Sequence, residues 1–203
     1  MPFLPAPGDR VLARFAQLFA GLALFGVSIA LIVRAELGVM PWTVLEQGLT
    51  RSVGLSLGLW SVLIGAVLLA LSMRLGLRPG MGTLANIVLV GVVIDATLAL
   101  LPPLENLPLR IGALILGIAL NGVATGAYIG AGLGPGPRDG LVTSIATRTG
   151  RSLRLIRTLV EVGVIVVGVI LGGQLGVGTV VFALVIGPLM HFFVPLLDLR
   201  TKK

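Results

Sequence analysis

Long runs of apolar residues alternate with short polar segments along this chain. Crossing the hydrocarbon core of a bilayer, which is about 30 Å thick, takes about 20 apolar residues in an α-helix. Six runs of about this length lie near 11–33, 56–73, 82–101, 110–131, 153–171 and 179–197. The pattern therefore predicts an all-α polytopic membrane protein with six transmembrane helices.

Two shorter stretches remain outside these spans, near 41–53 and 137–149. Each follows a Gly/Pro-rich loop, begins with a proline and ends at a glycine, and these are start and stop signals of helices. Neither stretch is long or apolar enough to span easily, because both carry charged residues such as Glu46 and Arg138. We expect two short helices that are either re-entrant or interfacial.

The chain also matches itself. A gap-free shift of 96 residues places "LGVMP" (37–41) on "LGPGP" (133–137) and Gly54 on Gly150. About a quarter of the aligned positions are identical, and the matching Gly, Pro and Arg positions indicate an internal duplication. The expected organisation is a single membrane domain over 1–203, with repeat 1 at 11–101 and repeat 2 at 107–197.

Each repeat holds three spans and one short helix, so the second repeat must enter the membrane from the opposite side. This predicts two inverted three-helix repeats, related by a pseudo-two-fold axis in the membrane plane. The distribution of basic residues predicts the orientation, because cytoplasmic loops carry an excess of Lys and Arg. With both termini inside, the outer segments hold only Arg34, Arg51 and Arg110. The inner segments hold Arg10, Arg14, Arg74, Arg78, Arg138, Arg148, Arg151, Arg154, Arg157, Arg200, Lys202 and Lys203.

Composition narrows the class of protein further. The chain is 56% hydrophobic and 11% charged, with a net charge of +7, one histidine and no cysteine. Because the basic residues flank apolar runs, we assign them to topology and anionic headgroups and expect no nucleic-acid partner. The absence of cysteine excludes disulfides and Cys-ligated zinc. The sequence has no Ser-His-Asp arrangement and no phosphate-binding P-loop, so we expect neither a cofactor nor an enzymatic activity.

The stretch "GLGPGPRDGL", residues 132–141, is the densest polar and glycine-rich cluster of the chain. The free N–H groups at a helix that starts at Pro137 form a positive dipole end suited to an anionic group. We expect a substrate-binding site where the starts of the two short helices converge. Its predicted residues are Gly134, Gly136, Pro137, Arg138, Asp139, Pro41, Thr43, Asn121 and Glu161.

Each of these residues also has a plainer interpretation. The Gly/Pro loop can be a tight turn in which Arg138 and Asp139 form an interfacial ion pair. Glu161 follows Arg157 by one helical turn, and the two can pair on one helix face. Asn121 fits an interhelical hydrogen bond as well as a ligand contact.

The segments "GLGPGPRDGL", "TGRSLRLIRTLVEVGVIVVGVILGG" and "GVGTVVFALVIGPLMHFF" resemble those of the YczE/YitT-type bacterial integral membrane proteins. The resemblance covers nearly the whole chain and is closer to the YczE-like branch, because the chain lacks the soluble carboxy-terminal domain of YitT-like members. It implies a multi-pass protein of the bacterial cytoplasmic (inner) membrane, and it names no substrate.

Inverted repeats with interrupted helices are the architecture of many secondary transporters. The expected function is therefore a small secondary transporter or facilitator for a small anionic or zwitterionic solute. The alternative is a non-transporting membrane scaffold or accessory protein for a partner complex. The expected partners are the lipid bilayer and a small-molecule solute, and a homodimer is left open.

Overall fold

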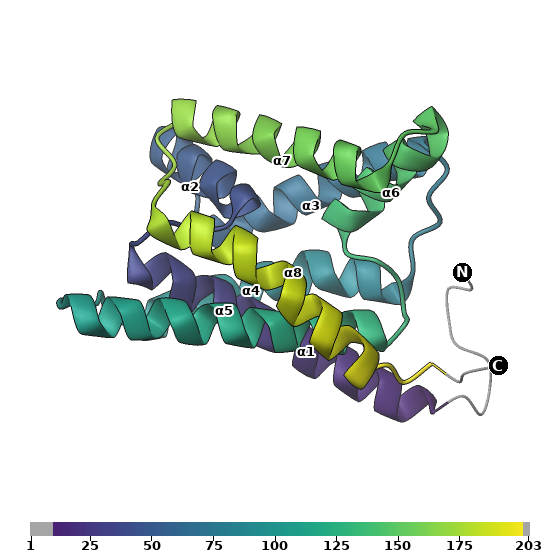
Figure 1. Ribbon diagram of the computed structural model, residues 1–203, viewed down its shortest axis with the longest axis horizontal. Helices are drawn as coiled ribbons and strands as arrows, with labels where there is room; N and C mark the ends of the chain where they lie inside the picture. The colour runs from purple at the N-terminus through teal and green to yellow at the C-terminus, as the bar shows by residue number, and fades with distance from the viewer. Residues whose placement is uncertain (1–9, 201–203) are drawn as a thin grey trace.

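A computed structural model describes residues 10–200 of the chain. Lys202 and Lys203, which the charge pattern assigns to the cytoplasmic side, lie outside the described residues. The described chain is all-helical, as the apolar runs predict, and holds eight helices (Figure 1). They are α1 (Val11–Ala35), α2 (Pro41–Val53), α3 (Leu57–Arg74), α4 (Met81–Leu100), α5 (Leu107–Gly130), α6 (Pro137–Thr149), α7 (Leu153–Ile170) and α8 (Val177–Leu196).

Local sequence explains where the short helices begin and end. Both α2 and α6 carry proline at the first helical position, where a missing N–H costs no intrahelical bond. Both are followed by a glycine in the left-handed conformation, Gly54 and Gly150, which glycine adopts without steric cost. The predicted short helices at 41–53 and 137–149 are therefore confirmed to the residue.

Five helices are long and apolar enough to cross a membrane: α1, α3, α4, α5 and α8. The sixth predicted span corresponds to α7, which has the 18 residues needed but carries Arg154, Arg157 and Glu161. These three charges set α7 apart from the other long helices. Length and composition therefore support five of the six predicted spans.

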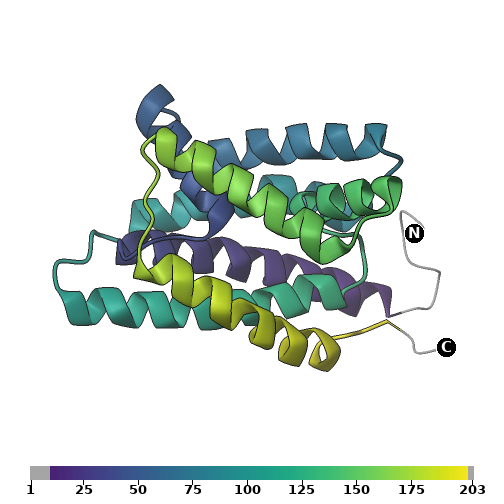
Figure 2. The same cartoon turned by 45° about the horizontal axis from the view of Figure 1, so that its top comes forward.

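The helices form two layers, with α1, α4, α5 and α8 in one and α2, α3, α6 and α7 in the other (Figure 1). Within the first layer α1 packs on α4 and α5, and α5 packs on α8. Within the second, α2 packs on α7 and α3, and α6 packs on α3 and α7. The layers join along α3 and α4, and the turned view shows α7 at the front, between α3 and α8 (Figure 2).

Backbone geometry recurs at the same interval as the sequence match. Positive φ angles occur at four pairs of positions 96 residues apart: Glu36 and Gly132, Gly38 and Gly134, Gly54 and Gly150, and Gly76 and Gly172. Hydrogen bonds between the loops and the long helices recur in the same way. Gly82 N–H donates to Leu133 O (2.8 Å), and Gly178 N–H donates to Leu37 O (2.7 Å).

The start of α1 and the end of α8 lie at the same end of the molecule (Figure 1). Arg14 Nε, in the first turn of α1, donates to Ala131 O at the end of α5 (2.7 Å). Leu199 N–H, just after α8, donates to Gly130 O at the same place (3.0 Å). The first and last described helices are thus tied to one common point.

Candidate functional site

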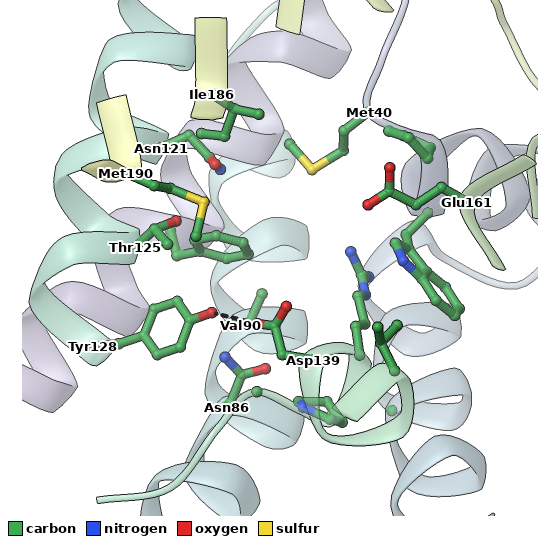
Figure 3. A pocket seen from close by; sticks show the side chains of 18 of the residues that line it. Met40, Asn86, Val90, Asn121, Thr125, Tyr128, Asp139, Glu161, Ile186 and Met190 are labelled. Atoms are coloured by element: carbon green, nitrogen blue, oxygen red, sulfur yellow. Dashed lines mark hydrogen bonds between the residues drawn. The ribbon is translucent and has the colours of Figure 1, made fainter. Parts of the chain in front are cut away.

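A cavity of about 340 Å³ lies between the two layers, a volume within the range of small-molecule sites. Its first wall is largely apolar and comes from the layer of α1, α4, α5 and α8, with Phe25, Val90, Phe182, Ile186 and Met190. Its second wall comes from α2, α6 and α7 and carries the charges. Figure 3 shows the polar side chains of the second wall pointing toward the apolar one.

Arg138, in the first turn of α6, reaches across to α2. Its guanidinium forms an ion pair with Glu46, whose side chain is fully buried. The guanidinium also lies over the ring of Trp42, 5.3 Å from the ring centroid, where a cation–π attraction holds it in place. Arg138 therefore links the start of α6 directly to α2, and it is partly exposed while its partner Glu46 is fully buried.

Asp139 joins a second network on the same wall. One of its oxygens accepts from Arg157 Nη2 (2.6 Å), and the other accepts from the Tyr128 hydroxyl (3.2 Å). Arg157 Nε lies 3.4 Å from Glu161 Oε1 one turn along α7. The interpretation of Arg157 and Glu161 as a pair on one helix face is thus confirmed. Asp139 extends that pair to α6 and α5.

Most of the predicted site residues lie around this cavity. Pro41, Asn121, Gly136, Pro137, Arg138, Asp139 and Glu161 line it. Asn121 also donates to Ser28 Oγ (2.8 Å), so it lines the cavity and joins two helices as well. The structure thus brings together seven of the nine predicted residues, from four segments of the chain.

Two predicted residues lie elsewhere. Thr43 is fully buried and lies outside the lining of the cavity, because α2 turns this side chain into the packed interior. Gly134 has φ of 129° and packs against α4, where an added Cβ would lie 2.8 Å from Thr83 Oγ1. Glycine at this position allows a strained turn and a close contact between segments. Gly134 therefore lies outside the lining of this cavity.

The structure does not pair Arg138 with Asp139, as the plainer interpretation of the Gly/Pro loop proposes. Arg138 pairs with Glu46 instead of Asp139, and Asp139 pairs with Arg157. The cavity is thus lined by two arginines and by two carboxylates, those of Asp139 and Glu161, while the carboxylate of Glu46 is buried behind Arg138. Charges of both signs therefore line this wall.

Sequence reasoning missed several polar residues of the lining. Tyr128 and Asn86 lie on α5 and α4 and point into the cavity (Figure 3). Trp42 lines it beside Arg138. A polar side chain within an apolar span is costly unless it meets a partner or a cavity. Tyr128, the one tyrosine of the chain, and Asn86 both carried that signal.

A family model matches residues 12–195 of this chain, that of a family of unknown function, DUF6198. An uncharacterized protein of Haemophilus influenzae is 39% identical over 87% of this chain and 80% of its own length. The uncharacterized membrane protein YczE of Bacillus subtilis is 36% identical over 92% of this chain and 88% of its own. The uncharacterized protein YyaS of Bacillus subtilis is 29% identical over 88% of this chain and 90% of its own. No solved structure matches the chain.

Proposed function

We propose that this chain, which belongs to the YczE-like family DUF6198, is a small secondary transporter or facilitator of a small solute. The observation that carries the proposal is a cavity with ion-paired charges, built between helices of a membrane protein. Ionisable groups inside a membrane are costly, and they commonly mark substrate and ion pathways. The starts of two short helices meet at this cavity, as they do in transporters with interrupted helices.

The proposed solute is zwitterionic. The sequence leads us to expect an anionic or a zwitterionic solute, and the ion pairs favour the second. Each cavity arginine already faces a carboxylate, so a simple anion would have to displace Glu46 or Asp139 from its partner. A solute with both charges can contact Arg157 and a carboxylate without leaving a buried charge unpaired, which is strongly unfavourable.

The proposed architecture has α7 as the sixth span and two inverted repeats. The recurrence of turns and loop hydrogen bonds at 96 residues supports the duplication. The opposite directions of α1 and α5 support the inversion (Figure 1). We expect an experimental structure to superpose 14–101 on 110–197 about an axis in the membrane plane. An axis along the membrane normal, or short helices that fully span, would refute this arrangement.

The proposed topology places both termini in the cytoplasm. The common position of the α1 start and the α8 end supports it, and so does the excess of basic residues in the inner segments. Reporter fusions or labelling of single introduced cysteines should place both termini inside and the 102–109 loop outside. A cytoplasmic 102–109 loop would contradict this topology.

The transport proposal is tested by a screen of small zwitterionic, anionic and cationic solutes for thermal stabilisation of the purified protein. Solutes that stabilise the protein are then offered to proteoliposomes. We expect saturable uptake of a zwitterionic solute. Stabilisation by a protein partner without uptake of any solute would support the scaffold instead. If the protein is a scaffold, the cavity charges should contribute only to the stability of its fold.

A further inference from the structure

The joint between α3 and α4 closes one side of the cavity. A Cβ added at Gly91 would lie 2.5 Å from Gly58 O and 2.5 Å from Val62 Cγ2, so the two backbones touch. Asp95 on α4 accepts from the Ser56 hydroxyl (2.5 Å) and from Gly58 N–H (2.7 Å). Small residues and hydrogen bonds therefore hold the two layers together along this side.

The corresponding joint between α7 and α8 is open. The positions 96 residues later are Ser152, Arg154, Gly187 and His191, so Gly58 is replaced by a long cation and Asp95 by histidine. Within residues 10–200, α7 does not pack along α8 as α3 packs along α4. A Cβ at Gly187 would meet no described heavy atom within 4 Å. The cavity therefore opens sideways between these helices.

Helix α8 is weakened at the opening. Gly187 is followed by Pro188, which lies inside the helix. Proline removes one backbone hydrogen bond and clashes with the carbonyl four residues earlier, so helices bend at such positions. Gly187 adds conformational freedom at the adjacent residue. The width of the opening can thus change by bending of α8 at this point.

The rim of the opening is apolar on its outward side and charged on its inward side. Its outward residues are apolar and exposed, among them Val162 and Val166 on α7 and Leu184 on α8, as expected of a surface that faces lipid. Its inward residues on α7 are Arg157 and Glu161, whose side chains are 44% and 39% exposed. Charged groups exposed at membrane depth are costly unless a polar group covers them.

We propose that the opening between α7 and α8 is a lateral portal through which a single-chain zwitterionic amphiphile enters the cavity from the bilayer. This inference rests on the proposed function and names the class of solute. The head contacts Arg157, Glu161 and Asp139, and the chain leaves between α7 and α8. A cavity of about 340 Å³ holds the head, while the portal leaves the chain among the lipids.

The charges at the rim favour an amphiphile over a second copy of this chain. A copy docked by α7 and α8 would press apolar residues such as Leu184 against Arg157 and Glu161. That contact would cover two partly exposed charges with apolar groups and leave them only each other and Asp139 as partners, which is unfavourable. A zwitterionic head instead presents a charge of the opposite sign to each of them.

The test uses the full chain in phosphatidylcholine nanodiscs and a lysophosphatidylcholine with a photoreactive diazirine on the acyl-chain carbons next to the head, which the proposal places at the inner mouth of the portal. After irradiation, mass spectrometry locates the labelled residues. We expect adducts on Ile186 and Met190, which face the cavity, as well as on lipid-facing Leu184. Gly187→Leu should abolish the adducts on Ile186 and Met190 and spare those on Leu184. Gly163→Leu is the matched control, because a Cβ there also meets no described atom within 4 Å, and it should change nothing.

Labelling confined to Leu184 and other lipid-facing residues in the unmodified protein would overturn the portal. A disulfide between two copies of Gly187→Cys, together with unlabelled cavity residues, would overturn it in favour of a dimer. Photolabelling does not require transport, so the experiment can refute the portal and the transporter independently of each other. Cavity adducts without uptake of any solute refute the transporter and leave the portal standing. Uptake without cavity adducts refutes the portal alone.

Discussion

Arg138→Ala is expected to destabilise the folded protein by about 3–5 kcal/mol, because it leaves a buried carboxylate without its cation. Glu46 is fully buried, and Arg138 is its ion-pair partner. The same change removes the guanidinium that lies over Trp42. Thermal or chemical unfolding in one fixed detergent measures the effect against the unmodified protein.

A double variant separates the pair from the rest of the site. Arg138→Met with Glu46→Leu replaces both charges by apolar groups, and such replacements of a buried pair are often neutral or stabilising. We expect the double variant to recover most of the stability that Arg138→Ala loses. An Arg138→Ala protein as stable as the unmodified one would show that the pair does not hold the short helices together.

Gly136→Val is expected to lower uptake while leaving the protein folded. Gly136 has an ordinary extended backbone with φ of −60°, so a side chain is compatible with its conformation. A Cβ there would lie 3.5 Å from the Tyr128 hydroxyl and 3.6 Å from Asp139 Oδ2. Valine therefore covers the polar end of the cavity. Loss of one charged hydrogen bond to a solute, about 1.5–3 kcal/mol, lowers uptake about tenfold to a hundredfold.

Gly163→Val is the matched control for this effect. Gly163 is exposed on α7, and a Cβ there meets no described heavy atom within 4 Å. We expect normal uptake and normal stability from this variant. Equal uptake by Gly136→Val and Gly163→Val would show that the solute does not pass the polar end of the cavity.

The helices are readable from sequence because their signals are local. Apolar runs set the long helices, and Pro41, Pro137, Gly54 and Gly150 set the short ones, since each acts on its own turn of backbone. The recurrence of turns at 96 residues is equally visible at Gly38 and Gly134, Gly54 and Gly150, and Gly76 and Gly172, because a left-handed turn favours glycine. Seven predicted residues cluster around one cavity because the starts of α2 and α6 both lie at it.

The pairing of charges was not readable in the same way. Arg138 and Glu46 are 92 residues apart, and they meet because the fold brings the start of α6 within reach of α2. Sequence proximity instead suggested Asp139 as the partner of Arg138. The partners of Asp139 come from α5 and α7, so their contact depends on how three helices pack. Thr43 was misplaced for a related reason, since only the packing of α2 decides which of its faces is buried.

The most direct test of a solute path through this cavity is uptake into proteoliposomes that contain the unmodified chain or Gly136→Val at equal, verified insertion. A stabilising zwitterionic solute from the screen is the probe. The account predicts saturable uptake by the unmodified protein and loss of that uptake in Gly136→Val, with unchanged thermal stability. Uptake that is equal in the two proteins, or absent from a correctly inserted and stable unmodified protein, would contradict it.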